Sequence, residues 1–191
     1  RWVEANEPSL IVEEGSGLDM VFAHINDRNI RSLLKGMVVA LVLISLLLVV
    51  ALRSIRLGLL SLLTNLAPAG LAYGTWGLTN ARIDLSAAVV ICMSIGIVVD
   101  DTVHFLSKYL HARRVQNLRG SQAMRYTFNT VGIALTITTI VLVAGFLVLT
   151  ASPFNPTVVT GLLLAMTLTY ALVVDFLFLP PLLIALDQRW S

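Results

Sequence analysis

The stretch LSAAVVICMSIGIVVDDTVHFLSKYL, residues 85–110, decides the fold. From Leu85 to Val99 it holds no charged residue, which indicates a membrane-spanning helix, but such a helix needs about 20 residues and this run is shorter. Apolar residues resume after the adjacent aspartates, at Phe105 and Leu106. The helix therefore continues most simply through the acidic pair, and we predict a span over 85–107.

An alternative ends the helix at Val99 and leaves Asp100 and Asp101 at the membrane surface. Such a span would be too short for the bilayer. An aspartate at a helix C-terminus also opposes the helix dipole. We therefore expect both acids within the membrane or close to its cytoplasmic edge.

The composition supports a membrane protein. Of the 191 residues, 57% are hydrophobic and 13% are charged, whereas soluble domains carry about 25% charged residues. The formal net charge of +2 is too small to suggest nucleic acid as a partner. The chain begins at Arg1, so we expect a piece of a longer protein.

Four further apolar stretches predict spans, at about 36–52, 57–78, 129–150 and 157–184. Segment 1–35 is more polar. Its residues 9–17, SLIVEEGSG, predict a short strand and turn, and apolar residues then recur at helical spacing from Leu18. We therefore expect two parts: residues 1–35, the end of an extracytoplasmic α+β domain with a lead-in helix, and residues 36–191, an all-α bundle of five transmembrane helices.

The basic residues indicate an orientation. They gather in alternate loops, which hold Arg53, Arg56, Lys108, Arg113, Arg114, Arg119, Arg125 and Arg189. The short loops 79–84 and 151–156 hold only Arg82. The positive-inside rule places the richer set in the cytoplasm, so the N-terminal segment is expected outside and the C-terminus inside. Residues 108–127 fit either an amphipathic surface helix or a solvated basic loop.

The acidic pair indicates proton chemistry. A charge at the bilayer centre costs about 2.5–3.5 kcal/mol on insertion scales, and desolvation and mutual repulsion oppose ionisation of both acids. His104 follows Asp100 by four residues and Asp101 by three, so its imidazole can reach either acid on a helix. Asp100, Asp101 and His104 are therefore the candidate proton relay. For His104 the alternative is an interfacial residue that does not titrate.

Other polar residues within the spans are candidates for supporting roles. Asp175 either joins the relay from another helix or satisfies backbone groups near Pro180 and Pro181. Asn65, Thr136 and Thr139 are the candidates to hydrogen-bond the acids. Small residues at four-residue steps, such as Ala88, Cys92 and Gly96, are better explained as helix-packing seams than as chemistry.

Several chemistries have no motif here. The sequence lacks a GxxxxGK[ST] phosphate loop, an HExxH or CxxC metal motif and a GxSxG elbow. We therefore expect no enzyme, no metal and no cofactor. A transporter without nucleotide chemistry draws its energy from an ion gradient, and acids with a histidine suit protons.

The chain resembles the resistance-nodulation-division superfamily, specifically the MmpL-like hydrophobe/amphiphile exporters that include hopanoid transporters. GIVVDDTVHFLSKY, residues 96–109, resembles the acidic fourth helix of a transporter half, although Val98 stands where a glycine is common. LRSIRLGLLSLLTNLAPAG, residues 52–70, resembles the cytoplasmic hinge and following helix. DFLFLPPLLIAL, residues 175–186, resembles the closing helix.

This resemblance implies helices two to six of one half, and proton-driven export or transfer of a hydrophobic molecule or lipid at the bacterial inner membrane. It assigns the relay to Asp100 and Asp101, and less directly to His104. The implied partners are membrane lipid, the substrate and the remainder of the same transporter; related exporters are monomers, dimers or trimers, so a homo-oligomer stays open. The ending DQRWS, residues 187–191, favours the second half. A sterol- or lipid-sensing module is the alternative, and an ion channel subunit is a third, weaker one.

Overall fold

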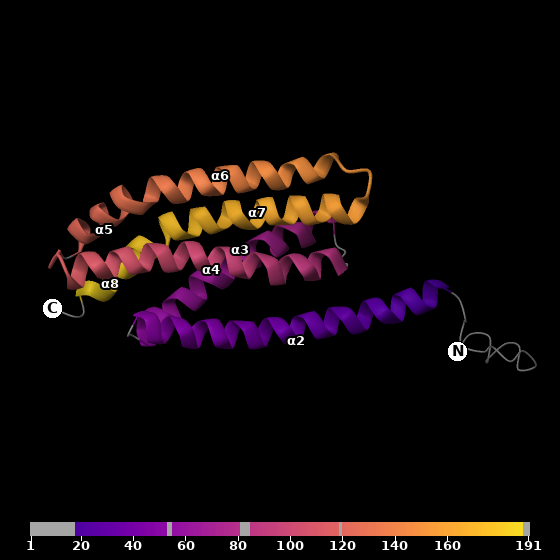
Figure 1. The fold of residues 1–191 in the computed structure, drawn as a ribbon, viewed down its shortest axis with the longest axis horizontal. Coiled ribbons are helices and arrows are strands. Elements are labelled where there is room, and N and C mark those ends of the chain that lie inside the picture. The colour runs from indigo at the N-terminus through magenta and orange to yellow at the C-terminus, as the bar shows by residue number, and fades with distance from the viewer. Residues whose placement is uncertain (1–17, 53–54, 81–84, 119, 189–191) are drawn as a thin grey trace, which may run out of the picture.

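The computed structural model describes residues 18–52, 55–80, 85–118 and 120–188. Within them all regular structure is helical, which confirms the all-α class (Figure 1). The strand predicted for residues 9–17 lies outside the described residues. The helices are α2 (Leu18–Leu52), α3 (Ile55–Asn80), α4 (Leu85–Arg114), α5 (Ser121–Thr127), α6 (Ile133–Val148), α7 (Asn155–Leu177) and α8 (Leu179–Gln188).

Four stretches in the described part of the chain are long and apolar enough to cross a membrane: Arg28–Val50, Ser86–Arg114, Ser121–Ala151 and Asn155–Ala185. They correspond to four of the five predicted spans. The remaining prediction, 57–78, forms the continuous helix α3, which runs through Pro68 without ending there. At 26 residues, α3 also has the length that a span needs.

Helix α2 joins the predicted lead-in helix and the first span into one rod. Its 35 residues rise about 52 Å at 1.5 Å per residue, well beyond the roughly 30 Å of a bilayer core. Figure 1 shows its N-terminal part projecting past the end of the other helices. Only 6% of its most apolar window is buried inside the protein, so α2 borders the bundle along one side.

Segment 108–127, which the sequence left open between a surface helix and a loop, is neither. Helix α4 continues to Arg114, a turn follows, and α5 begins at Ser121. A π-helical turn, Phe128–Gly132, then joins α5 to α6, so the fourth span begins eight residues earlier than the predicted 129. Ala123 and Met124 of α5 are buried, which ties this segment to the bundle.

The fifth predicted span is broken near its end. Helix α7 begins with Pro156 in its first turn, where proline fits, and it ends at Leu177. Helix α8 begins at Leu179, just before the two consecutive prolines. Proline lacks the N–H that a helix interior needs, so Pro180 and Pro181 set this break.

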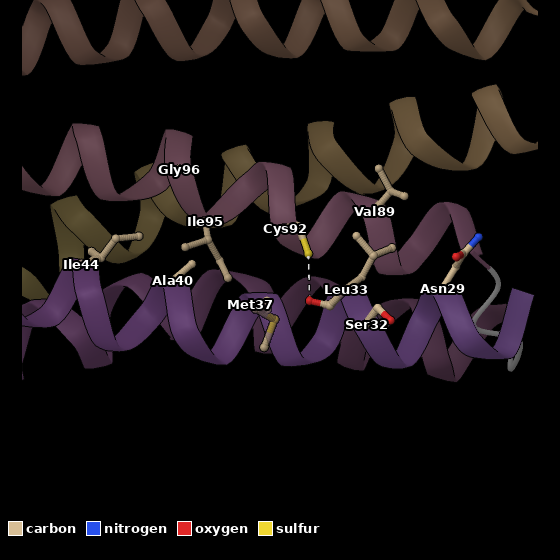
Figure 2. Close-up of a pocket in the computed structure, with 11 residues that line it drawn as sticks. Asn29, Ser32, Leu33, Met37, Ala40, Ile44, Val89, Cys92, Ile95 and Gly96 are labelled. Carbon is tan, nitrogen blue, oxygen red and sulfur yellow. Dashed lines mark hydrogen bonds between the residues drawn. The ribbon is translucent and has the colours of Figure 1, made fainter.

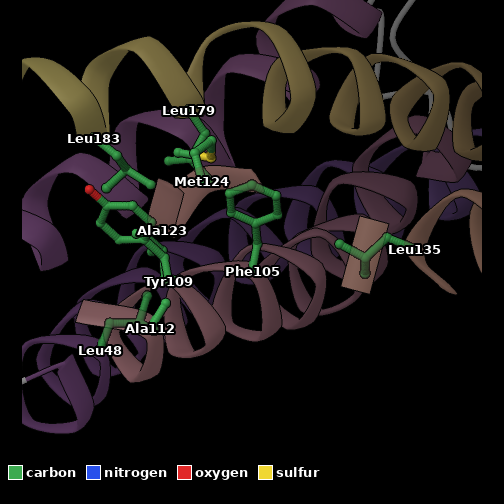
Figure 3. Close-up of a cluster of buried hydrophobic side chains, with 10 residues drawn as sticks. Leu48, Phe105, Tyr109, Ala112, Ala123, Met124, Leu135, Leu179 and Leu183 are labelled. Carbon is green, nitrogen blue, oxygen red and sulfur yellow. The ribbon is translucent and has the colours of Figure 1, made fainter. Parts of the chain in front are cut away.

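Helix α7 lies at the centre of the bundle, packed against α3, α4 and α6. Three apolar clusters follow its length. Trp76, Ala87, Val90, Leu163 and Leu164 form the first; Val98, Leu168 and Ala171 form the middle one. The largest lies at the end that carries α5 and α8 (Figure 3). Its buried residues are Leu48, Phe105, Leu106, Tyr109, Ala112, Ala123, Met124, Leu135, Leu179 and Leu183.

Candidate functional site

Helix α4 carries the acidic pair in its interior. It runs without a break from Leu85 to Arg114, so the helix continues well past Val99. Its last turn holds His111, Arg113 and Arg114, and the two arginine cations suit a helix C-terminus. The acids are therefore part of a regular helix, and successive side chains around them point in directions about 100° apart.

Asp100 and His104 meet on the outer face of α4. Nε2 of His104 lies 3.6 Å from Oδ1 of Asp100, and the two side chains are 64% and 71% exposed respectively. This is the contact that the four-residue spacing predicts. The distance exceeds a hydrogen bond, so the pair attracts only when the imidazole is protonated.

A groove of about 370 Å³ opens over these residues. Ile97 and all three predicted relay residues line it from α4, and the opposite wall comes from the helical rod that includes α6: Val131, Ala134, Leu135, Thr138 and Leu142. Asp101 is half-buried at its edge. The structure thus gathers Asp100, Asp101 and His104 at one polar opening in an otherwise apolar wall.

Asp175 is placed differently. It lies on α7, is 2% exposed, and accepts a hydrogen bond from the Thr102 hydroxyl of α4, at 3.1 Å to Oδ1 and 3.4 Å to Oδ2. Thr102 itself is fully buried. Asp101, the neighbour of Thr102, is close enough for its charge to act on Asp175. Asp175 therefore lies at the α4–α7 contact, bonded to the residue that directly follows Asp101.

The other predicted supporting residues do not contact the acids through the bonds found. Thr136 and Thr139 each donate at 2.8 Å to the backbone carbonyl four residues earlier, of Gly132 and Leu135. Asn65 is 2% exposed, and neither its amide nitrogen nor its oxygen has a hydrogen-bond partner among the described residues.

Sequence reasoning missed Thr102 and Thr138. Thr138 of α6 lines the acidic groove, whereas the predicted Thr136 and Thr139 are not among its lining residues. Thr102 stands in the motif itself, but on the side of α4 that faces the bundle. The signal for it was the periodicity of the buried face, since Val98, Phe105 and Thr102 fall on one helical stripe.

A larger groove of about 810 Å³ separates α2 from α4 (Figure 2). Met37, Ala40 and Ile44 of α2 face Val89 and Ile95 of α4 across it. Asn29 and Ser32 lie at one end. Cys92 contacts the Leu33 carbonyl at 3.7 Å between them. No carboxylate is among the described residues that line this groove, and most of its described lining is apolar.

No cluster of three metal-binding side chains occurs among the described residues. The absence of a metal and of a cofactor stays a prediction.

Comparison with known proteins gives one match. The model of the MMPL family matches residues 14–191. No curated protein and no solved structure matches.

Proposed function

The chain belongs to the MMPL family, whose members are transporters, and on that premise we propose that it is part of a proton-driven secondary transporter of the resistance-nodulation-division type. It exports or transfers hydrophobic molecules or lipids across or from the bacterial inner membrane. The N-terminal segment lies outside and the C-terminus in the cytoplasm, as the basic loops indicate. Membrane lipid, the substrate and the rest of the transporter are its partners.

One observation carries this proposal: a half-buried aspartate and an Asp–His pair share a groove in the middle of an apolar helix. Ionisable groups within a span mark ion pathways, because their burial is costly without a function. Carboxyl and imidazole groups bind and release protons near neutral pH when their surroundings change. A proton can enter from the exposed Asp100–His104 pair and reach Asp101 at the inner edge.

The test uses the complete parent protein in vesicles with an imposed proton gradient and total membrane lipid as the candidate cargo. Mass spectrometry identifies what moves. Asp100→Asn and Asp101→Asn should each abolish gradient-dependent movement while expression is retained. Asp27→Asn is the matched control, because it makes the same chemical change on α2 just outside the apolar stretch Arg28–Val50.

Normal transport in both groove variants would overturn the proposal. Tight lipid binding with no response to the gradient would favour a lipid-sensing module instead. Steady conductance in a planar bilayer would favour an ion channel subunit.

A further inference from the structure

Asp175 is an acid that the groove does not contain. Its carboxyl is enclosed in the protein, on the opposite side of α4 from the exposed Asp100–His104 pair. The middle cluster, with Val98 and Ala171, lies about one turn to one side of it. Phe105 and Leu179, both fully buried and drawn in Figure 3, follow Thr102 and Asp175 by about one helical turn along the chain. The carboxyl therefore sits in a short polar layer between two apolar ones.

The aromatic side chains close this layer toward the basic end of the bundle. Phe105 packs edge to face against Phe128, with the ring centroids 5.3 Å apart. Phe128 packs in the same way against Phe176, with the ring centroids 5.2 Å apart. Phe176 directly follows Asp175, and Phe128 opens the π-helical turn before α6. These rings therefore add apolar surface next to Asp175.

The buried carboxyl has few partners. Thr102 is its only hydrogen-bond donor in the described part of the chain, although an ionised carboxylate can accept about four hydrogen bonds. No ion pair to it is found among the described residues. An ionised group so placed would bear most of its desolvation cost without compensation.

An unpartnered amide lies on the buried face of α3. Asn65 falls on the buried stripe of α3 that includes Trp76, three helical turns away. Trp76 packs with Leu163 and Leu164 of α7, and Leu60, on the other side of Asn65, packs with the cluster of Leu179.

Because α3 and α7 run antiparallel (Figure 1), these contacts set their register. Along α7 and α8, Leu164 and Leu179 bracket Asp175 as Trp76 and Leu60 bracket Asn65, so this register predicts that Asn65 lies near the turn that carries Asp175. Its side chain is 2% exposed, and neither of its polar atoms is bonded. A buried amide without partners is rare and calls for a ligand or a switching neighbour.

We propose that Asp175, Thr102 and Asn65 form a second proton-carrying site, which exchanges its proton with Asp101. In the loaded state Asp175 is a neutral carboxyl, and its O–H can donate to the Asn65 amide oxygen. When Asp175 passes the proton to Asp101, its carboxylate keeps the Thr102 hydrogen bond and can gain one from the Asn65 amide nitrogen. This inference deepens the proposed function and rests on it.

The titratable groups around the site are few. On α4, Asp101 directly precedes Thr102, and its charge acts on Asp175. Helix α6, Ile133–Val148, contains no titratable residue, and residues 58–79 of α3 contain only Tyr73, whose hydroxyl donates to the Ala87 carbonyl. Asp187 of α8 lies among the side chains outside the described part.

Carbodiimide labelling tests the site without relying on transport. Dicyclohexylcarbodiimide reacts with protonated carboxyls in apolar surroundings, and peptide mass spectrometry locates the adduct in the complete protein. We expect an adduct at Asp175 that grows as the pH falls and is absent in Asp175→Asn. Infrared spectra give a second readout, because a protonated carboxyl band should disappear in the same variant.

Two variants should shift the labelling midpoint in opposite directions. Thr102→Val removes a donor that favours the ionised form, so the midpoint should rise by about one pH unit. Asp101→Asn removes a neighbouring negative charge, so the midpoint should fall. Thr167→Val is the matched control, since that buried hydroxyl of α7 bonds only the Leu163 carbonyl, and it should shift nothing.

The inference is overturned if neither readout finds a protonated Asp175, or if Asp101→Asn leaves the midpoint unchanged. Protection from labelling by sodium at constant pH would assign the site to sodium and would also overturn it. Labelling as expected, in vesicles that show no gradient-driven transport, would contradict the proposed function but leave the proton site in place.

Discussion

The hydrogen bond between Thr102 and Asp175 offers a measurable report on the charge state of the buried acid. We consider the change Thr102→Val, which keeps the shape of the side chain and removes its hydroxyl. The hydroxyl also lies 3.2 Å from the Val98 carbonyl. A double-mutant cycle with Asp175→Asn therefore isolates the part that depends on the carboxyl.

The expected size of the coupling depends on whether Asp175 holds a proton. Hydrogen bonds between helices in a membrane average about 0.6 kcal/mol and reach about 1.7, because the unfolded chain also finds partners. A hydrogen bond to an ionised group contributes about 1.5–3 kcal/mol. The distances of 3.1 and 3.4 Å describe one proton shared between two oxygens, which is a weak arrangement. We expect a coupling of about 1 kcal/mol or less at acid pH, rising toward about 2 kcal/mol as Asp175 ionises.

The assay is unfolding of the complete protein in mixed detergent micelles, for the wild type, both single variants and the double variant, at acid and at alkaline pH. Thr167→Val should give no coupling to Asp175→Asn, because its hydroxyl bonds its own helix. A coupling near 2 kcal/mol that does not change with pH would mean a permanently ionised Asp175. That result, or no coupling at any pH, would refute the reasoning.

Two further predictions concern helix packing and the outer pair. A Cβ at Gly161 would lie 2.5 Å from the carbonyl oxygen of Phe146, so Gly161→Ala should force α6 and α7 apart and lower stability by about 1–3 kcal/mol in a thermal unfolding assay. Gly145→Ala, where nothing lies within 4 Å, should be nearly neutral, and equal losses would contradict the close contact. His104→Gln should leave the unfolding temperature unchanged, because its side chain is exposed and lies 3.6 Å from Asp100, but it should alter the pH profile of transport. The control is His111→Gln, a change at another exposed histidine of α4. If both variants show the same pH profile, His104 is not part of the relay.

The features that lie within one helix could be predicted from the sequence. The contact of His104 with Asp100 follows from their spacing alone, because residues four apart are neighbours on any helix. The passage of α4 through the acidic pair follows from the apolar residues on both sides. Both predictions needed only the period of a helix.

The features that join two helices could not be predicted in the same way. The bond from Thr102 to Asp175 depends on how far α7 is shifted along α4, and that shift is set by the packing of Val98 against Leu168 and Ala171. The sequence made Thr136 and Thr139 candidates to hydrogen-bond the acids. A buried threonine can instead bond its own backbone four residues earlier, as both do, and the sequence does not distinguish the two outcomes.

Three consecutive residues of α4 pass from the groove to the core. Asp100 is exposed, Asp101 is half-buried and Thr102 is fully buried. On the proposed assignment, a proton that moves from Asp101 to Asp175 turns the acceptor of Thr102 from a carboxylate into a neutral carboxyl, and this weakens the polar contact between α4 and α7. Since α7 also packs against α3 and α6, a small shift of α7 would change its contacts with both helices. We therefore expect proton occupancy at Asp175, rather than at the exposed Asp100, to govern how α7 sits in the bundle.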